Sequence, residues 1–128
     1  MNHYKEQSGQ ALVTLLIFIV MALAIAVAAS FIIASNSLAA TNVQEGIIAR
    51  QMADSGIETA YLKIIRTAGA YNGETITVDG GPVLITVTGT TTKKIDSTAT
   101  NGNFIKKVES IVTYSQNELT QVSWKEIN

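Results

Sequence analysis

The sequence contains no cysteine, and its only histidine is His3. The chain can therefore form neither disulfide bonds nor a thiolate metal site, and imidazole chemistry is nearly excluded. A formal net charge of -1 provides no strong field to attract nucleic acid or acidic substrates. With 128 residues there is room for one small core in addition to a membrane helix.

A long apolar run lies close to the N-terminus. Residues 11–34 contain only Thr14 and Ser30 as polar members, and no charge occurs between Glu6 and Glu45. At about 1.5 Å per residue this run forms a helix of roughly 36 Å, enough to cross a hydrocarbon core of about 30 Å. We therefore expect a membrane helix over residues 10–35.

A secretory signal peptide is the alternative interpretation of this run. Ala22-Leu23-Ala24 and Ala26-Val27-Ala28 are typical of signal peptidase sites. Such signals normally have a positively charged leader and an apolar core of about 7 to 15 residues. Here Lys5 is offset by Glu6 and the apolar run is longer, which favours a permanent anchor.

Small residues recur at four-residue spacing along the apolar run, at Ala22, Ala26, Ser30 and Ala34. In lipid, such rows let helix backbones approach closely and gain packing contacts. Alanine is also simply common in membrane helices, so the row by itself leaves both interpretations open. We take it as a candidate surface for packing against other helices.

After Asn36 the sequence has the period of an amphipathic helix. Its apolar residues recur at spacings of three and four, at Val43, Ile47, Ile48, Met52, Ile57, Tyr61, Ile64 and Ile65. Gly69 and Tyr71-Asn72-Gly73 are suited to a left-handed helix C-cap. We expect one helix from Gln10 to about Thr67, whose amphipathic half, residues 36–68, lies outside the bilayer.

A strip of small residues follows the amphipathic half, at Ala49, Ala53, Gly56 and Ala60. Side chains this short let a sheet or a neighbouring helix approach closely. A kink or fray at Gly56 is the other interpretation, since glycine costs a helix about 1 kcal/mol relative to alanine. Close packing is favoured because the flanking alanines share the face.

Residues 69–128 are expected to form an antiparallel β domain. A period of two predicts strands at residues 75–78, 83–88, 94–100, 104–114 and 119–125. Asp79-Gly80-Gly81-Pro82 and Asn101-Gly102-Asn103 are hairpin signals. One apolar face collects Ile76, Val78, Val83, Ile85, Val87, Ile95, Val108, Val112, Tyr114, Val122 and Trp124. The predicted fold is α+β, a long N-terminal helix packed on four or five antiparallel strands.

Side chains that could carry chemistry are scattered over this domain. Asp79, Asp96 and Glu109 lie on different predicted strands or turns, so an acid–base pair or a metal site lacks its partners. Gly80 and Gly81 lie in a hairpin turn rather than between a strand and a helix, as a phosphate-binding loop requires. We expect no enzyme activity, no cofactor and no metal, and we interpret the carboxylates as solvated surface groups.

Two lysine pairs, Lys93-Lys94 and Lys106-Lys107, flank the second hairpin signal and could meet across it. Such a patch is a candidate surface for contact with DNA phosphates or an anionic cell surface. The alternative is that the lysines protect sheet edges against aggregation. Without interleaved aromatic residues, nucleic-acid contact is the less favoured interpretation.

The N-terminal half of the chain resembles type IV pilins and pseudopilins. The resemblance rests on a short polar leader ending in Gly9, an apolar helix that starts at once, and the segment from Ala49 to Ala60. It covers roughly residues 5–68 and is closest to the minor-pilin branch, whose helix carries a segment like Ala53-Asp54-Ser55-Gly56.

The resemblance implies a processing site and a set of partners. In this family a membrane peptidase cuts after the glycine, here between Gly9 and Gln10, and methylates the new N-terminus. Residues 1–9 would then be a prepilin leader, and the mature subunit a single-pass membrane protein until assembly machinery adds it to an extracellular filament. Its partners would be copies of itself or other pilins. A membrane-anchored extracellular binding module that does not polymerise is the alternative.

The chain departs from the family pattern at two positions. Pilins usually have phenylalanine or methionine where this chain has Gln10, and glutamate where it has Thr14. It also lacks the C-terminal disulfide loop of many Gram-negative pilins. In that family the glutamate is thought to pair with the N-terminal amine of a neighbouring subunit, so its replacement by Thr14 points away from a major-pilin role.

Overall fold

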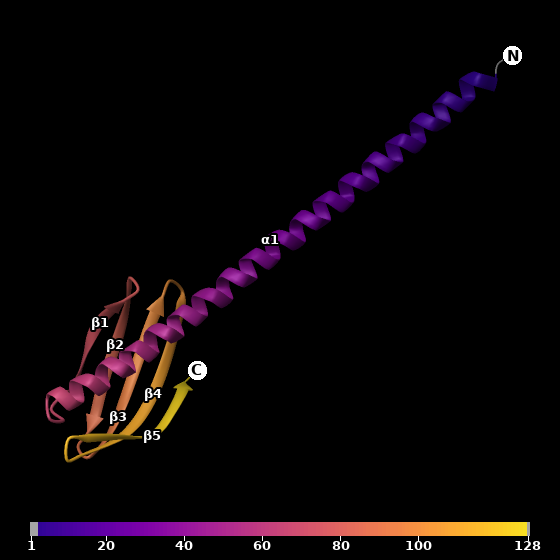
Figure 1. The fold of residues 1–128 in the computed structure, drawn as a ribbon. Coiled ribbons are helices and arrows are strands. Elements are labelled where there is room, and N and C mark those ends of the chain that lie inside the picture. The colour runs from indigo at the N-terminus through magenta and orange to yellow at the C-terminus, as the bar shows by residue number, and fades with distance from the viewer. Residues whose placement is uncertain (1–2, 128) are drawn as a thin grey trace. The chain divides into compact units, whose positions relative to one another are not determined.

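The computed structural model describes residues 3–127, with side chains from residue 9 onward. Its elements are α1 (His3–Arg66), β1 (Gly73–Val78), β2 (Gly81–Gly89), β3 (Thr92–Asn101), β4 (Phe104–Ser115) and β5 (Glu118–Ile127) (Figure 1). This is the expected α+β layout of a long N-terminal helix packed on antiparallel strands. The helix begins before the predicted Gln10. The chain divides into two compact units, one up to Thr41 and one from Asn42 onward.

The five strands form one antiparallel sheet in which each strand pairs with its neighbour in sequence, in the order β1-β2-β3-β4-β5. Asp79 and Gly80 both have positive φ (49° and 80°), as do Gln116 and Asn117 (51° and 64°). Two consecutive left-handed residues are the pattern of the two-residue type I′ turn, whose twist matches that of the flanking strands. The first turn is tighter than expected, because Gly81 and Pro82 already belong to β2.

The core lies between the part of α1 after Asn42 and one face of the sheet. Alternate residues of the central strands point toward the helix because side chains alternate along a strand. The buried apolar side chains are Ala49, Met52, Ala53, Ile57, Ala60, Ile64, Val83, Ile85, Val87, Ile95, Ala99, Val108 and Val112. Ile76, Val78 and Tyr114 are partly buried against this cluster.

The prediction that Val122 and Trp124 share the buried face of the sheet is wrong for Val122, and for Trp124 it gives the correct face but not the burial. Gln121 lies opposite Val112 and Ser123 lies opposite Ile111, so Val122 is an additional residue in a β-bulge and is 65% exposed. Trp124 lies on the helix-covered face, but it is on the edge strand and is 39% exposed. The guanidinium of Arg50 lies 5.5 Å from the Trp124 ring centre and covers part of it.

The helix ends with a left-handed residue that the sequence did not single out. Gly69 N–H donates to Ile64 O (2.8 Å), and Ala68 N–H donates to Ile65 O (3.3 Å). This pair of bonds is the Schellman motif, in which the residue after the C-cap has positive φ. That residue is Ala68, with φ 51°, and Gly69 follows with φ 85°. The left-handed conformation expected at the end of the helix is thus present at Gly69, and it begins one residue earlier, at Ala68.

Candidate functional site

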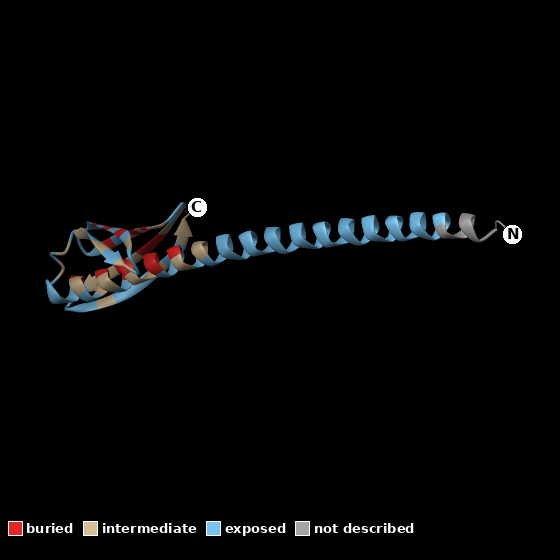
Figure 2. Cartoon of the chain, turned by 90° about the horizontal axis from the view of Figure 1, so that it is seen from above, coloured by how far each residue is buried: buried red, intermediate tan, exposed pale blue. Residues whose placement is uncertain are grey.

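The apolar segment of α1 in the first unit is the most distinctive surface of the chain. This helix is long and apolar enough to cross a membrane, and none of its most apolar window is buried within the chain. Large side chains such as Phe18, Ile25 and Phe31 are 66–71% exposed. Figure 2 shows the corresponding part of the helix in pale blue throughout. So much apolar surface requires either lipid or other helices around it.

Two hydroxyl groups interrupt the apolar surface, and both are bonded within the helix. Thr14 Oγ1 donates to Gln10 O (2.9 Å), and Ser30 Oγ donates to Ala26 O (2.9 Å). Hydroxyls bonded one turn back leave no donor unpaired in an apolar environment. The row Ala22, Ala26, Ser30 and Ala34 is exposed along its whole length.

The predicted processing site lies inside α1. Gly9 and Gln10 are both helical and exposed, and a Cβ placed on Gly9 would meet no atom within 4 Å. Of the predicted leader, Met1 and Asn2 lie outside the described residues, and α1 includes the positions from His3 onward.

The small-residue strip of the second unit lies against the sheet. Ala49, Ala53 and Ala60 are fully buried, and Gly56 is buried as well. A Cβ placed on Gly56 would clash with Ser97 Oγ and would lie 2.8 Å from Val83 Cγ1. Gly56 therefore sets how closely α1 approaches β2 and β3, and α1 continues through this position without a break.

The prediction that the two lysine pairs meet across their hairpin is wrong. Lys93 and Lys94 lie opposite Val112 and Ile111, whereas Lys106 and Lys107 lie opposite Ala99 and Thr98. Adjacent residues of a strand also point to opposite faces of the sheet. Lys93 is 5% exposed and its ammonium donates to Gly89 O (3.3 Å). The four lysines therefore form no joint basic patch. One lysine of each pair, Lys94 and Lys107, lies on the outer face, where both ammonium groups lie 3.6 Å from the carboxylate of Asp96.

The other three lysines pair with carboxylates. Lys94 Nζ lies 2.8 Å from Glu109 Oε2, and Lys107 Nζ lies 3.6 Å from Asp96 Oδ1, both on the face away from the helix. Lys106 Nζ lies 2.8 Å from Glu126 Oε1 on the helix-covered face. Each positive charge is thus matched locally.

Glu109 is the centre of the charge cluster on the outer face. Its side chain is 7% exposed and accepts from Lys94 and from Lys125, whose Nζ lies 3.0 Å from Glu109 Oε1. The hydrogen bond from Lys94, followed by that from Lys125, lowers the pKa of this carboxyl below its usual 4.5. The cluster holds β3, β4 and β5 together across the sheet.

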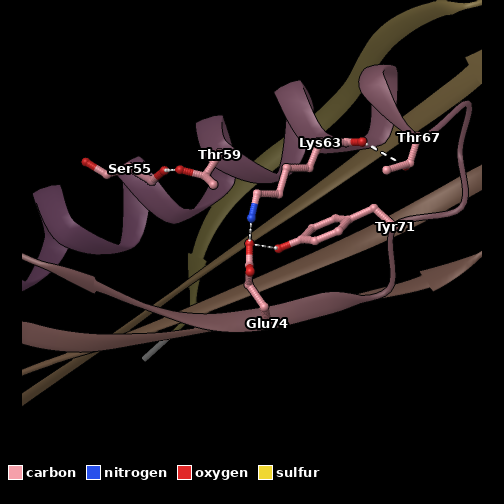
Figure 3. A network of polar contacts seen from close by, with 6 residues as sticks. All are labelled: Ser55, Thr59, Lys63, Thr67, Tyr71 and Glu74. Atoms are coloured by element: carbon pink, nitrogen blue, oxygen red, sulfur yellow. Dashed lines mark hydrogen bonds and ion pairs between the residues drawn. The ribbon is translucent and has the colours of Figure 1, made fainter.

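A second polar network joins the end of α1 to β1. Lys63 donates to Glu74, and Tyr71 Oη also donates to Glu74 (3.1 Å), as Figure 3 shows. The Lys63 ammonium lies 5.7 Å from the centre of the Tyr71 ring. Burial and then the bond to Glu74 raise the pKa of Tyr71 to about 12, and Lys63 lowers the pKa of Glu74. These groups fix the end of α1 against β1.

Asp54 lies at the helix–sheet boundary with an incompletely paired carboxylate. Its Oδ1 atom is buried and has no hydrogen-bond partner. Burial raises the pKa of Asp54, and the nearby Arg50 partly opposes that shift. Arg50 itself contacts Glu126, with 3.6 Å between Nε and Oε2.

Sequence reasoning missed Ser97 and Ser110, which are fully buried on the helix-covered face. Tyr61 Oη contacts Ser110 Oγ, and Ser110 Oγ donates to Ser123 O (3.2 Å), which links α1 to β4 and β5. The signal was present in the sequence, because Ser97 alternates with Ile95 and Ala99, but only apolar residues were assigned to the buried face.

In the part of the chain that the structure describes, no group of three or more His, Cys, Asp or Glu side chains could hold a metal ion. A comparison of the chain with models of known protein families, with curated proteins and with solved structures finds no match. The uncovered apolar segment of α1 is therefore the feature that points to a function.

Proposed function

We propose that the chain is a structural subunit of a type IV pilus or a related filament. The observation that carries the proposal is the apolar segment of α1, which has no cover from the rest of the chain. It is followed by a separate unit with its own buried core between α1 and the sheet. A helix that leaves its apolar side chains uncovered beside a well-packed domain suits a subunit that exchanges lipid for neighbouring helices.

Assembly would proceed through the same helix surface. Before assembly, the apolar segment holds the subunit in the membrane. In the filament it packs against the corresponding segments of other copies or of other pilins, while the β domain forms the outer surface. Lipid and helix surfaces are similarly apolar, so close contact along Ala22, Ala26, Ser30 and Ala34 supplies the preference for helix over lipid. A prepilin peptidase and assembly machinery complete the set of proposed partners.

The experiment that tests the proposal most directly is mass analysis of the N-terminus of the full protein extracted from its membrane. A mature chain that begins at a methylated Gln10 is the expected result. A chain that begins after Ala24 or Ala28 would show conventional secretion. An intact Met1 would favour a permanent anchor that does not polymerise, and either outcome would overturn the proposal.

A further inference from the structure

β5 (Glu118–Ile127) forms an edge of the sheet and, among the described residues 3–127, pairs with β4 alone. Every second residue of an edge strand points its N–H and C=O groups away from the sheet, where they are open to another strand. β5 is ten residues long, and both Val122 and Trp124 on it are exposed. This edge is therefore able to extend the sheet by pairing with a further strand.

The bulge at Val122 changes which residues of β5 share a face. Leu119 lies opposite Tyr114, and Trp124 lies opposite Ser110, so both point to the helix-covered face. In a regular strand, two residues separated by an odd number of positions point to opposite faces. The additional residue reverses that alternation, and it places Glu118 and Lys125 together on the outer face.

With this bulge, β5 is complementary to a second copy of itself. When two β5 strands run antiparallel about a two-fold axis between Gln121 and Val122, Glu118 lies opposite Lys125. In the same register Leu119 lies opposite Trp124, and Thr120 lies opposite Ser123. Both members of each pair lie on the same face. Opposite charges, aromatic–aliphatic pairs and hydroxyl pairs are combinations that stabilise neighbouring antiparallel strands.

Neighbouring registers lack this complementarity. A shift of two residues in one direction puts Glu126 opposite Leu119, and a shift in the other direction puts Lys125 opposite Gln116. Both shifts lose the two charge pairs that the two-fold axis creates. A shift of one residue turns side chains to opposite faces.

We propose that β5 is the edge through which two copies of this chain pair, joining two five-stranded sheets into one about a two-fold axis. All copies in a polar filament point the same way. The two-fold axis proposed here is perpendicular to the sheet, so the parts of α1 that pack on the two sheets run in opposite directions. The pair therefore joins copies from two assemblies rather than neighbours within one. The pairing itself depends only on the unit from Asn42 onward, whereas its place between two assemblies rests on the proposed function.

Charge-reversal variants of the full chain in detergent micelles test this pairing, with the oligomeric state measured by analytical ultracentrifugation. All variants also carry Ala26→Leu/Ser30→Leu, so that packing through the small-residue row of α1 does not contribute to dimerisation. Glu118→Lys and Lys125→Glu should each weaken dimerisation by at least about tenfold, because each turns two attractive cross-strand pairs into repulsive ones. The double variant Glu118→Lys/Lys125→Glu restores the attraction and should restore the dimer. Glu58→Lys, an exposed position on α1, is the control and should leave dimerisation unchanged.

Disulfide cross-linking provides a second measurement that does not depend on the Lys125–Glu109 pair. The natural chain has no cysteine, so an introduced pair reports on one register only. Thr120→Cys/Ser123→Cys should form covalent dimers under mild oxidation, and either single variant should not, because like positions lie apart across the axis. The proposal would be overturned by a protein that stays monomeric at all concentrations or by a dimer that neither charge reversal weakens. It would also be overturned if the single-cysteine variants cross-linked as well as the double variant.

Discussion

Gly56 of α1 packs against Val83 of β2 so closely that a Cβ on the glycine would lie 2.8 Å from Val83 Cγ1. The same atom would overlap the Ser97 hydroxyl of β3. Two strands and the helix thus meet at a point that has no room for one methyl group. This contact explains why glycine, a residue that weakens helices, lies inside α1.

The first prediction is that Gly56→Ala destabilises the protein by about 1 to 3 kcal/mol, because the added methyl group overpacks the helix–sheet contact. Thermal unfolding of the full chain in detergent measures the effect. Gly46→Ala is the matched control, since a Cβ there would meet only Phe104 Cδ1, at 3.8 Å. That control should stabilise the helix by up to about 1 kcal/mol. If both substitutions stabilise, the close contact at Gly56 is not a constraint.

The second prediction concerns Ser97, whose hydroxyl is buried without a hydrogen-bond partner. Ser97→Ala removes an unpaired polar group and should stabilise the fold by about 1 kcal/mol. Ser110→Ala is the comparison, because Ser110 Oγ contacts Tyr61 Oη and donates to Ser123 O. It should destabilise by about 1 kcal/mol. Equal effects on the midpoint of denaturant unfolding would contradict the assigned difference.

The third prediction is that Ala68→Gly stabilises the protein by about 0.5 to 1 kcal/mol. Ala68 has φ 51°, a conformation in which glycine avoids the cost of a Cβ. Ala70→Gly is the control two residues away, outside the positive-φ positions, and should be neutral or slightly destabilising. The comparison uses melting temperatures under one set of conditions, and a lower melting temperature for Ala68→Gly would count against the Schellman assignment.

Much of the sheet follows from the sequence, because every second residue of β2 from Val83 to Val87 is apolar and because Ile95 and Ala99 share one face of β3. Val83, Ile85 and Ile95 are buried as the alternation predicts. The pattern fails in β5 because one additional residue, Val122, reverses the alternation, and no residue type in that strand marks where a bulge falls. The two lysine pairs were expected to meet because they flank the same turn. Which residues of β3 and β4 lie opposite each other depends on the strand register, which the length of the turn sets.

Of the candidate site, the residues could be predicted from the sequence, but the surfaces that they contact could not. An uncharged apolar run identifies the uncovered part of α1 from composition alone, since only lipid or other apolar surface can surround it. The Ala49–Ala60 strip was recognisable from its spacing, and its partner surface on β2 and β3 required the structure. The row from Ala22 to Ala34 is covered by nothing within one copy of the chain, so its partner surface belongs to lipid or to another molecule.

The fourth prediction is an acid-side loss of stability that depends on Glu109. Lys94 and then Lys125 hold the pKa of Glu109 below its usual 4.5. A carboxyl whose pKa is lower in the folded state stabilises the fold above its unfolded pKa, and this contribution is lost as pH falls through the folded value. The melting temperature of the natural protein should therefore fall below pH 4.5 more steeply than that of Glu109→Gln.

Glu58→Gln is the control for this measurement, because Glu58 is an exposed carboxylate on α1. This substitution leaves the cluster of Lys94, Glu109 and Lys125 in place, so Glu58→Gln should lose stability on acidification more steeply than Glu109→Gln. Near neutral pH, Glu109→Gln should be the less stable of the two variants, since it leaves Lys94 and Lys125 without their shared acceptor. Parallel acid-side slopes for the natural protein and Glu109→Gln would contradict the role given to Glu109.

The last prediction separates a polymerising subunit from a lone anchor, and it concerns the row that contains Ala26 and Ser30. If neighbouring helices pack on this row, Ala26→Leu/Ser30→Leu should abolish filaments and leave membrane insertion intact. Leucine is at least as favourable in lipid, but its side chain holds helix backbones apart. Electron microscopy of sheared surface material, beside membrane fractionation of the same cells, measures both properties.

The control is Ala24→Leu/Ala28→Leu, which adds the same bulk on the opposite side of the helix, because a shift of two residues turns the face by about 200°. Filaments of normal number from Ala26→Leu/Ser30→Leu would remove this row from the assembly interface. A minor subunit is rare in a filament, so filaments made of another pilin are also counted in cells that lack this chain. An unchanged number of those filaments would favour the lone anchor.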